Sequence, residues 1–251
     1  MAIKKKSREE IKLMKMAGHV VALVHQEMKS IIKPGLSTKY LDSIAYQIIK
    51  DNKCEPTFLG YNGFQGSICA SVNDMVVHGI PSEDTILKEG DIIAVDVGAT
   101  FRGYVGDSAW TYPVGEISDE NKRLLKVTEE ALYAAISQAK ENNTLDDIGS
   151  AIEKIAKANN LGIVREYGGH GVGSRMHEDP FIFNYSTGNK TILKSGYTLA
   201  IEPMLNLGCD EVYVLDDKWG VVTKDHKSSA HFEHSILITE NSAEILTKLS
   251  D

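Results

Sequence analysis

Apolar residues recur with a helical period near the start of the chain. Over residues 8–33 they fall at steps of three or four, and Pro34-Gly35 then ends the pattern. A second helical pattern follows over about residues 38–49, and Ser37 or Thr38 can cap its first turn. The sequence therefore predicts two consecutive amphipathic helices, each with one face turned toward a core.

The rest of the chain carries strand patterns, with two further helices between them. Residues 56–66 are rich in glycine and aromatic residues and indicate a loop. Helices are predicted over about residues 119–142 and again after a cap near Thr144. Apolar or alternating runs predict strands over residues 67–72, 91–99, 104–114, 198–203, 211–215, 221–223 and 230–239. This order of elements indicates an α/β (α+β) protein.

The second half of the sequence partly repeats the first. Residues 88–96 resemble residues 194–202, and residues 36–52 resemble residues 145–160 in their hydrophobic pattern. Each match is weak alone, but together they predict two related halves, roughly residues 8–115 and 118–247, around one site. No linker or low-complexity run separates the halves, so we expect a single domain over residues 1–251.

Composition and charge narrow the class of protein. The chain has 251 residues, 42% hydrophobic and 25% charged, which excludes collagen-like and largely disordered proteins. The formal charge of −8 disfavours nonspecific binding of nucleic acid, which needs a positive surface. Three cysteines without a CxxC pair indicate neither a disulfide framework nor structural zinc, and no apolar run reaches membrane-spanning length. We expect a cytoplasmic protein in a reducing compartment.

Acidic residues occupy equivalent places in the two halves. Asp96 and Glu202 each end an apolar run, where burying an unpaired carboxylate is costly. Taken alone, either residue could be an ordinary carboxylate at a strand end that faces water. A symmetric hairpin turn centred between Phe101 and Arg102, however, places Asp96 directly opposite Asp107. Like charges at that distance destabilise a sheet, so this register predicts a shared proton or a bound cation.

One histidine and one further acid complete the candidate cluster. His170 lies in the glycine-rich segment 167–173, which suits close approach of a ligand, although it also fits a simple turn. Glu233 lies in the apolar segment 230–239 and would join the other acids only if its face points inward; otherwise it is a surface residue. Four carboxylates and an imidazole suggest two divalent metals bridged by shared acids, and favour Mn²⁺, Fe²⁺ or Co²⁺ over thiolate zinc.

These residues, in their order along the chain, resemble the metal set of the methionine aminopeptidases. The flanking motifs agree over nearly the whole chain: Ser71-Val72-Asn73-Asp74 before His78-Gly79-Ile80-Pro81, Gly90-Asp91-Ile92, Gly169 to Gly173, His177-Glu178-Asp179-Pro180 and Ile201-Glu202-Pro203. The absence of a long insert between His170 and Glu202 resembles the bacterial type I form. The resemblance implies the pita-bread fold, with two pseudo-symmetric α/β halves.

The resemblance also implies a role for each member of the metal set. Asp96 would chelate one metal, Asp107 and Glu233 would bridge both, and His170 and Glu202 would bind the other. A water molecule activated by the two metals would attack the first peptide bond.

Three of the matched residues would take part in the chemistry. Glu202 would carry the proton to the leaving amine, and His78 and His177 would contact the substrate and stabilise the tetrahedral intermediate. Taken alone, His78 and His177 would be ordinary loop or core residues.

Further positions match the family's methionine pocket and a monovalent cation site. The expected pocket residues, which would otherwise be ordinary core, are Phe58, Tyr61, Phe64, Cys69, Met176 and Trp219. Phe58 and Met176 depart from the residues most often found there, which affects inhibitor selectivity. Asn73 and Ser229 would help to hold Na⁺ or K⁺ through oxygen atoms.

Two other readings share features with this one. Xaa-Pro aminopeptidases and prolidases have the same fold and ligand types, but normally carry an extra N-terminal domain for which Asp96 comes too early. A noncatalytic relative would be expected to have lost metal ligands, and all five are present here.

We therefore expect a monomeric type I enzyme that removes the initiator methionine from nascent chains whose second residue is small. A transient ribosome contact would suit that task, but the basic start of this chain is too short for the docking extension of some relatives. The chain's own Met1-Ala2 would itself qualify as a substrate.

Overall fold

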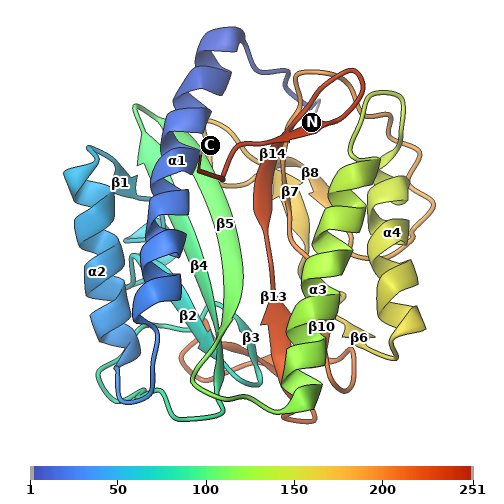
Figure 1. The fold of residues 1–251 in the computed structure, drawn as a ribbon. Helices are drawn as coiled ribbons and strands as arrows, with labels where there is room; N and C mark the ends of the chain where they lie inside the picture. Colours follow the sequence, from blue (N-terminus) through green and yellow to red (C-terminus); the bar gives the residue numbers. More distant parts are fainter. Residues whose placement is uncertain (1–2, 250–251) are drawn as a thin grey trace.

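The computed structural model describes residues 3–249, and its helices lie in two pairs on one side of the strands (Figure 1). The pairs are α1 (Arg8–Ile31) with α2 (Thr38–Asp51), and α3 (Asp119–Gln138) with α4 (Leu145–Ala158). Hydroxyl side chains of Ser7, Ser37, Ser118 and Thr144 cap their N-termini. The predicted helices are confirmed, with α3 ending four residues before the expected Asn142.

The strands pair antiparallel throughout the registers of the described sheets. One larger sheet has the order β1-β4-β2, with β5 also paired to β4; the other has the order β15-β14-β9-β7-β8. Two smaller sheets have the orders β13-β10-β6 and β11-β12-β3. The bounds are β1 (Glu55–Pro56), β2 (Ile68–Val72), β3 (Met75–Val77), β4 (Ile92–Phe101), β5 (Tyr104–Pro113), β6 (Gly162–Ile163), β7 (Gly169–Gly171), β8 (Glu178–Ile182), β9 (Thr198–Ile201), β10 (Met204–Asn206), β11 (Val212–Val214), β12 (Val221–Thr223), β13 (Ser229–His231), β14 (His234–Ile238) and β15 (Ala243–Ile245).

Some strands differ from those predicted. The single strand expected over residues 230–239 is divided into β13 and β14, because the backbone N–H of Glu233 leaves the ladder and donates to the carbonyl of Ala109. The sequence predicted no separate strand at β1, β3, β6, β7, β8, β10 or β15. All of these except β8 have two or three residues, which leaves little period to detect, and Pro180 interrupts the pattern of β8. The expected loop over residues 56–66 contains a short 3₁₀ turn, Tyr61–Gly63.

The predicted register of the β4–β5 hairpin is wrong by two residues. Phe101 pairs with Tyr104, so Arg102 and Gly103 form the turn, with φ angles of 48° and 82°. Positive φ at both central positions is the geometry of a type I′ turn, whose twist matches that of the strands. Asp107 consequently lies opposite Gly98, and Asp96 opposite Ala109. The two carboxylates are diagonal neighbours on the same face of the sheet, not directly opposed.

Each helix pair buries its own apolar core against a sheet. Side chains of α1 and α2 pack on β2 and β4, and those of α3 and α4 pack on β9 and β14. Helix α1 approaches β5 so closely that a Cβ atom added to Gly106 would lie 2.5 Å from the backbone nitrogen of Gly18. Within residues 3–249, the longest helices are too polar to cross a bilayer. A third cluster of buried apolar side chains is separate from these two cores, and several of its members line a cavity.

Candidate active site

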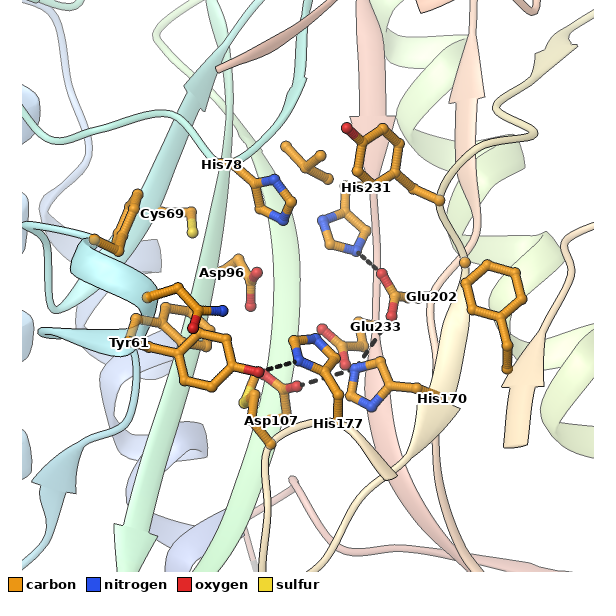
Figure 2. A pocket seen from close by; sticks show the side chains of 18 of the residues that line it. Tyr61, Cys69, His78, Asp96, Asp107, His170, His177, Glu202, His231 and Glu233 are labelled. Carbon is orange, nitrogen blue, oxygen red and sulfur yellow. Dashed lines mark hydrogen bonds and ion pairs between the residues drawn. The ribbon is translucent and has the colours of Figure 1, made fainter. Parts of the chain in front are cut away.

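A cavity of about 480 Å³ is lined by residues from both halves of the chain. Figure 2 shows its labelled side chains pointing toward one another from both halves. It is lined by every residue predicted to bind divalent metal, to catalyse or to form the methionine pocket, namely Phe58, Tyr61, Phe64, Cys69, His78, Asp96, Asp107, His170, Met176, His177, Glu202, Trp219 and Glu233. The tertiary structure therefore brings together residues that are far apart along the sequence.

Three buried side chains form the centre of the cluster. One ligand atom from each of Asp107, His170 and Glu233 lies within 4.8 Å of the others. Nε2 of His170 is 3.6 Å from Oδ2 of Asp107 and 3.4 Å from Oε1 of Glu202. Nδ1 of His170 donates to the carbonyl of Gly171, which leaves Nε2 as the unprotonated, ligating nitrogen of the neutral ring.

Burial and mutual repulsion destabilise the ionised carboxylates, and a bound cation would offset both effects. Burial raises the pKa of Asp107, Glu202 and Glu233 well above the ordinary range, and neighbouring acids raise those of Asp107 and Glu233 further. Burial, with Glu202 nearby, raises the pKa of Asp96 to about 7. Buried oxygen atoms of Asp96, Asp107 and Glu233 also lack hydrogen-bond partners. Oxygen-rich, unpaired and mutually repelling groups fit divalent cations.

Asp96 lies slightly apart from the central three residues. It comes from β4, whereas Asp107 comes from β5, and the shifted hairpin register separates them along the sheet. Asp96 is not part of the tight group of ligand atoms.

The two predicted substrate-contacting histidines stand at the edge of the acidic cluster. Nδ1 of His177 is hydrogen-bonded to the hydroxyl of Tyr61 at 2.9 Å, and its ring centroid is 4.4 Å from that of His170. His78 has a left-handed backbone with φ of 62°, and burial lowers the pKa of its ring to about 4. Burial also lowers the pKa of His177. Both rings are therefore neutral near pH 7, and each can donate one N–H.

The other end of the cavity is apolar. Phe58, Phe64, Cys69 and Met176 are buried, and the ring of Trp219 meets that of Phe64 edge-on at 5.0 Å. In Figure 2, Tyr61 and Cys69 lie at one end and His170 and Glu202 at the other, with Asp96, Asp107 and Glu233 between them. If the apolar end binds a side chain of the substrate, the substrate backbone lies beside the acids.

The predicted monovalent-cation residues lie together but outside this cavity. The backbone N–H of Ser229 donates to the carbonyl of Asn73. The side-chain amide of Asn73 already donates to Asp91 and accepts from the N–H of Ile92. That amide oxygen keeps one lone pair that a cation could use.

His231 lines the cavity but was not predicted as a site residue. It is 2% exposed, both ring nitrogens lack hydrogen-bond partners, and Nε2 is 3.5 Å from Oε2 of Glu202. The signal was present in the alternation of residues 231–234, because His231 shares the face of Glu233. Tyr167, whose ring meets that of His78 at 5.6 Å, and Phe181 also line the cavity and were missed.

Lys6 anchors the loop that carries Met176 and His177. Its ammonium group, 2% exposed, lies 2.8 Å from Oε2 of Glu178, and this ion pair lowers the pKa of Glu178. Lys6→Met should lower the free energy of unfolding by about 3–5 kcal/mol, because it leaves the buried Glu178 carboxylate without its counter-charge. Urea denaturation measures this loss, and KM should rise as His177 shifts.

Lys4→Met provides the matched control for that change. Lys4 is 61% exposed and its partner is Glu10. Exposed ion pairs contribute little to stability, so this variant should unfold nearly as the parent does. Equal stability losses in the two variants would show that the buried pair has no special role.

Comparisons with known proteins agree with this site. The chain matches metallopeptidase family M24 over residues 12–240. It is 54% identical to methionine aminopeptidase 1 of Bacillus subtilis (strain 168) over 245 residues, which cover 97% of this chain and 98% of the relative. Its fold matches the crystal structure of methionine aminopeptidase from Thermotoga maritima with a TM-score of 0.97, 44% identity, and coverage of 99% of this chain and 100% of that chain.

A more distant structure shares the fold alone. The prolidase from Pyrococcus furiosus is 24% identical with a TM-score of 0.79, and the match covers 98% of this chain but 66% of that one. The predicted fold class, a pita-bread α/β architecture with antiparallel sheets, is thus confirmed. The chain belongs to metallopeptidase family M24 and, within it, to the methionine aminopeptidases.

Proposed function

We propose that this protein removes the N-terminal methionine from nascent polypeptides whose second residue is small, by hydrolysing the first peptide bond. The observation that carries this function is the cavity itself, which joins an apolar end to a buried cluster of acids and imidazoles. Membership of the methionine aminopeptidases supports the same reaction.

We assign two divalent ions of the Co²⁺, Mn²⁺ or Fe²⁺ type to the acidic cluster. Asp96, Asp107 and Glu233, with His170 and Glu202 beside them, would hold the ions, and the unpaired buried oxygens support this. When bound, such ions supply Lewis acidity and a water molecule with a pKa near neutral. Asn73 and Ser229 remain our proposal for a Na⁺ or K⁺ site.

The chain's own residues orient the substrate and manage its protons. The apolar end takes the methionine side chain, so that the first carbonyl lies near His78 and His177. These neutral rings donate hydrogen bonds to its oxygen as negative charge develops there. Glu202, a carboxylate inside the cavity, holds the proton and passes it to the leaving amine.

We further propose one catalytic domain over residues 1–251 with pseudo-repeats over about 8–115 and 118–247, a monomeric state and a cytoplasmic location. The equivalent helix pairs in the two halves support the repeat (Figure 1). A transient contact with the ribosome would follow from action on nascent chains.

Hydrolysis of Met-Ala-Ser and Ala-Pro-Ser by chelator-stripped protein tests the function, with and without added Mn²⁺, Co²⁺ or anaerobic Fe²⁺. We expect metal-restored release of methionine from Met-Ala-Ser alone. Cleavage of Ala-Pro-Ser would assign the protein a prolidase-like activity. Metal binding without any cleavage would mean a noncatalytic role.

A further inference from the structure

Aromatic side chains form a continuous row at the rim of the cavity. The ring centroids of Phe181 and Phe183 are 4.7 Å apart, and those of Phe183 and Tyr185 are 5.3 Å apart. The guanidinium carbon of Arg165 lies 4.6 Å from the ring centroid of Tyr185. Phe181 is 43% exposed. Single exposed aromatic residues are common, but a stacked row beside a functional cavity indicates a binding surface.

The sheet register places the first ring of this row beside the active site. Phe181 pairs with His170 across β8 and β7, so both side chains lie on the same face. That face points into the cavity, and Phe181 lines it. Among residues 3–249, strand β8 is the edge of its sheet. The row therefore begins beside His170 and leads away from the acidic cluster.

The apolar end of the cavity, away from the aromatic row, determines which part of a substrate can contact the row. The apolar end, with Cys69 and Phe64, takes the first side chain in our proposed function, and the acids lie beside the first peptide bond. Figure 2 places Cys69 and His170 at opposite ends of the cluster. The chain that follows the first peptide bond can then continue toward Phe181, which lines the cavity and pairs with His170.

We propose that the row formed by Phe181, Phe183 and Tyr185 binds the substrate polypeptide downstream of the cleaved bond and selects apolar side chains at about its third to fifth residues. This inference rests on the proposed function. An extended chain advances about 3.3 Å per residue, so the two ring-to-ring steps span about three residues. Arg165 is already paired with Asp210 at 2.8 Å, so the row offers apolar rings and no free positive charge.

Two hexapeptides of equal length separate this preference from simple chain length: Met-Ala-Phe-Gly-Phe-Gly and Met-Ala-Ser-Gly-Ser-Gly. We expect kcat/KM to be about 3- to 10-fold higher for the phenylalanine peptide, with the difference in KM and not in kcat. Phe183→Ala should bring the ratio close to one, whereas Phe183→Leu, which keeps an apolar side chain of similar size, should retain part of it. Phe183 lies outside the cavity lining, so the acidic cluster is not altered.

Tyr40→Ala is the matched control, because Tyr40 is an exposed aromatic residue, 46% accessible, on α2 and away from the cavity. It should keep the full ratio. Equal kcat/KM for the two peptides in the parent, or an unchanged ratio in Phe183→Ala, would overturn the inference while the proposed function stands. Failure of the loaded parent to cleave any methionyl peptide would overturn the proposed function itself. A parent that forms dimers lost in Phe183→Ala would assign the row to contacts between copies.

Discussion

Glu202→Gln is expected to lower kcat for Met-Ala-Ser by about 10²- to 10⁴-fold, the usual contribution of a positioned proton carrier. The carboxylate lies 3.4 Å from Nε2 of His170 and 3.5 Å from Nε2 of His231, inside the cavity. A carboxylate can accept and release a proton, which the amide of glutamine cannot do. The measurement is the initial rate of methionine release at saturating Mn²⁺.

Two controls separate proton transfer from the loss of a ligand. The metal content of Glu202→Gln should be measured after dialysis, and activity should be compared at equal occupancy. Glu130→Gln removes an exposed carboxylate on α3, 53% accessible, and should leave kcat unchanged. A kcat for Glu202→Gln close to that of the parent would rule out Glu202 as the proton carrier.

Removal of divalent metal should lower the melting temperature, and the loss should grow as the pH is raised from about 5 to 8. The pKa of Asp96 is raised to about 7, and those of Asp107, Glu202 and Glu233 are raised well above their ordinary range. Between the unfolded pKa, near 4, and each folded pKa, the folded state binds more protons than the unfolded one. The stripped protein therefore loses stability as pH rises through this window. Bound cations remove the repulsion.

Thermal unfolding of loaded and stripped protein at several pH values measures the difference. At free metal about 1,000 times the dissociation constant, binding contributes about 4 kcal/mol, or on the order of 10 °C for a chain of this size. Burial lowers the pKa of His170 to about 3 and that of His78 to about 4, which weakens stability below about pH 6.5. This effect of the histidines acts on the loaded and the stripped protein alike, so it largely cancels in the difference between their melting temperatures.

Asp107→Asn is an internal control, because it should raise the stability of the stripped protein where metal removal lowers it. It removes one member of the repelling cluster, so the stripped variant should be more stable than the stripped parent at pH 8. It should also gain less from added metal. A melting difference that is constant across pH would show that the carboxylates do not repel one another in the stripped protein.

The hairpin between β4 and β5 shows which parts of the site the sequence can predict. Its turn was placed between Phe101 and Arg102, but the structure has it at Arg102 and Gly103. Arginine at positive φ is not indicated by its own preferences, so local chemistry could not choose the register. The error of two residues kept Asp96 and Asp107 on one face, because side chains alternate with a period of two.

His231 and Phe181 show what local pattern does not decide. His231 lies in an apolar run where either face could be buried, and it points into the cavity only because β13 packs there beside Glu233. Phe181 faces the cavity because the β7–β8 register pairs it with His170. Neither orientation can be read from neighbours along the chain.

The amphipathic periods determined the helices, and the hydroxyl caps determined where they begin, because both depend on interactions within a few residues. The motif residues determined the family and the identity of the acids and histidines. Only the tertiary structure decided the distances between those acids, the place of His231 and the aromatic row at the rim. The positions of Asp96, Asp107 and the aromatic row depend on strand register, which no local preference records. The place of His231 depends on packing between the two halves, where its carbonyl accepts a hydrogen bond from the distant Thr111 hydroxyl.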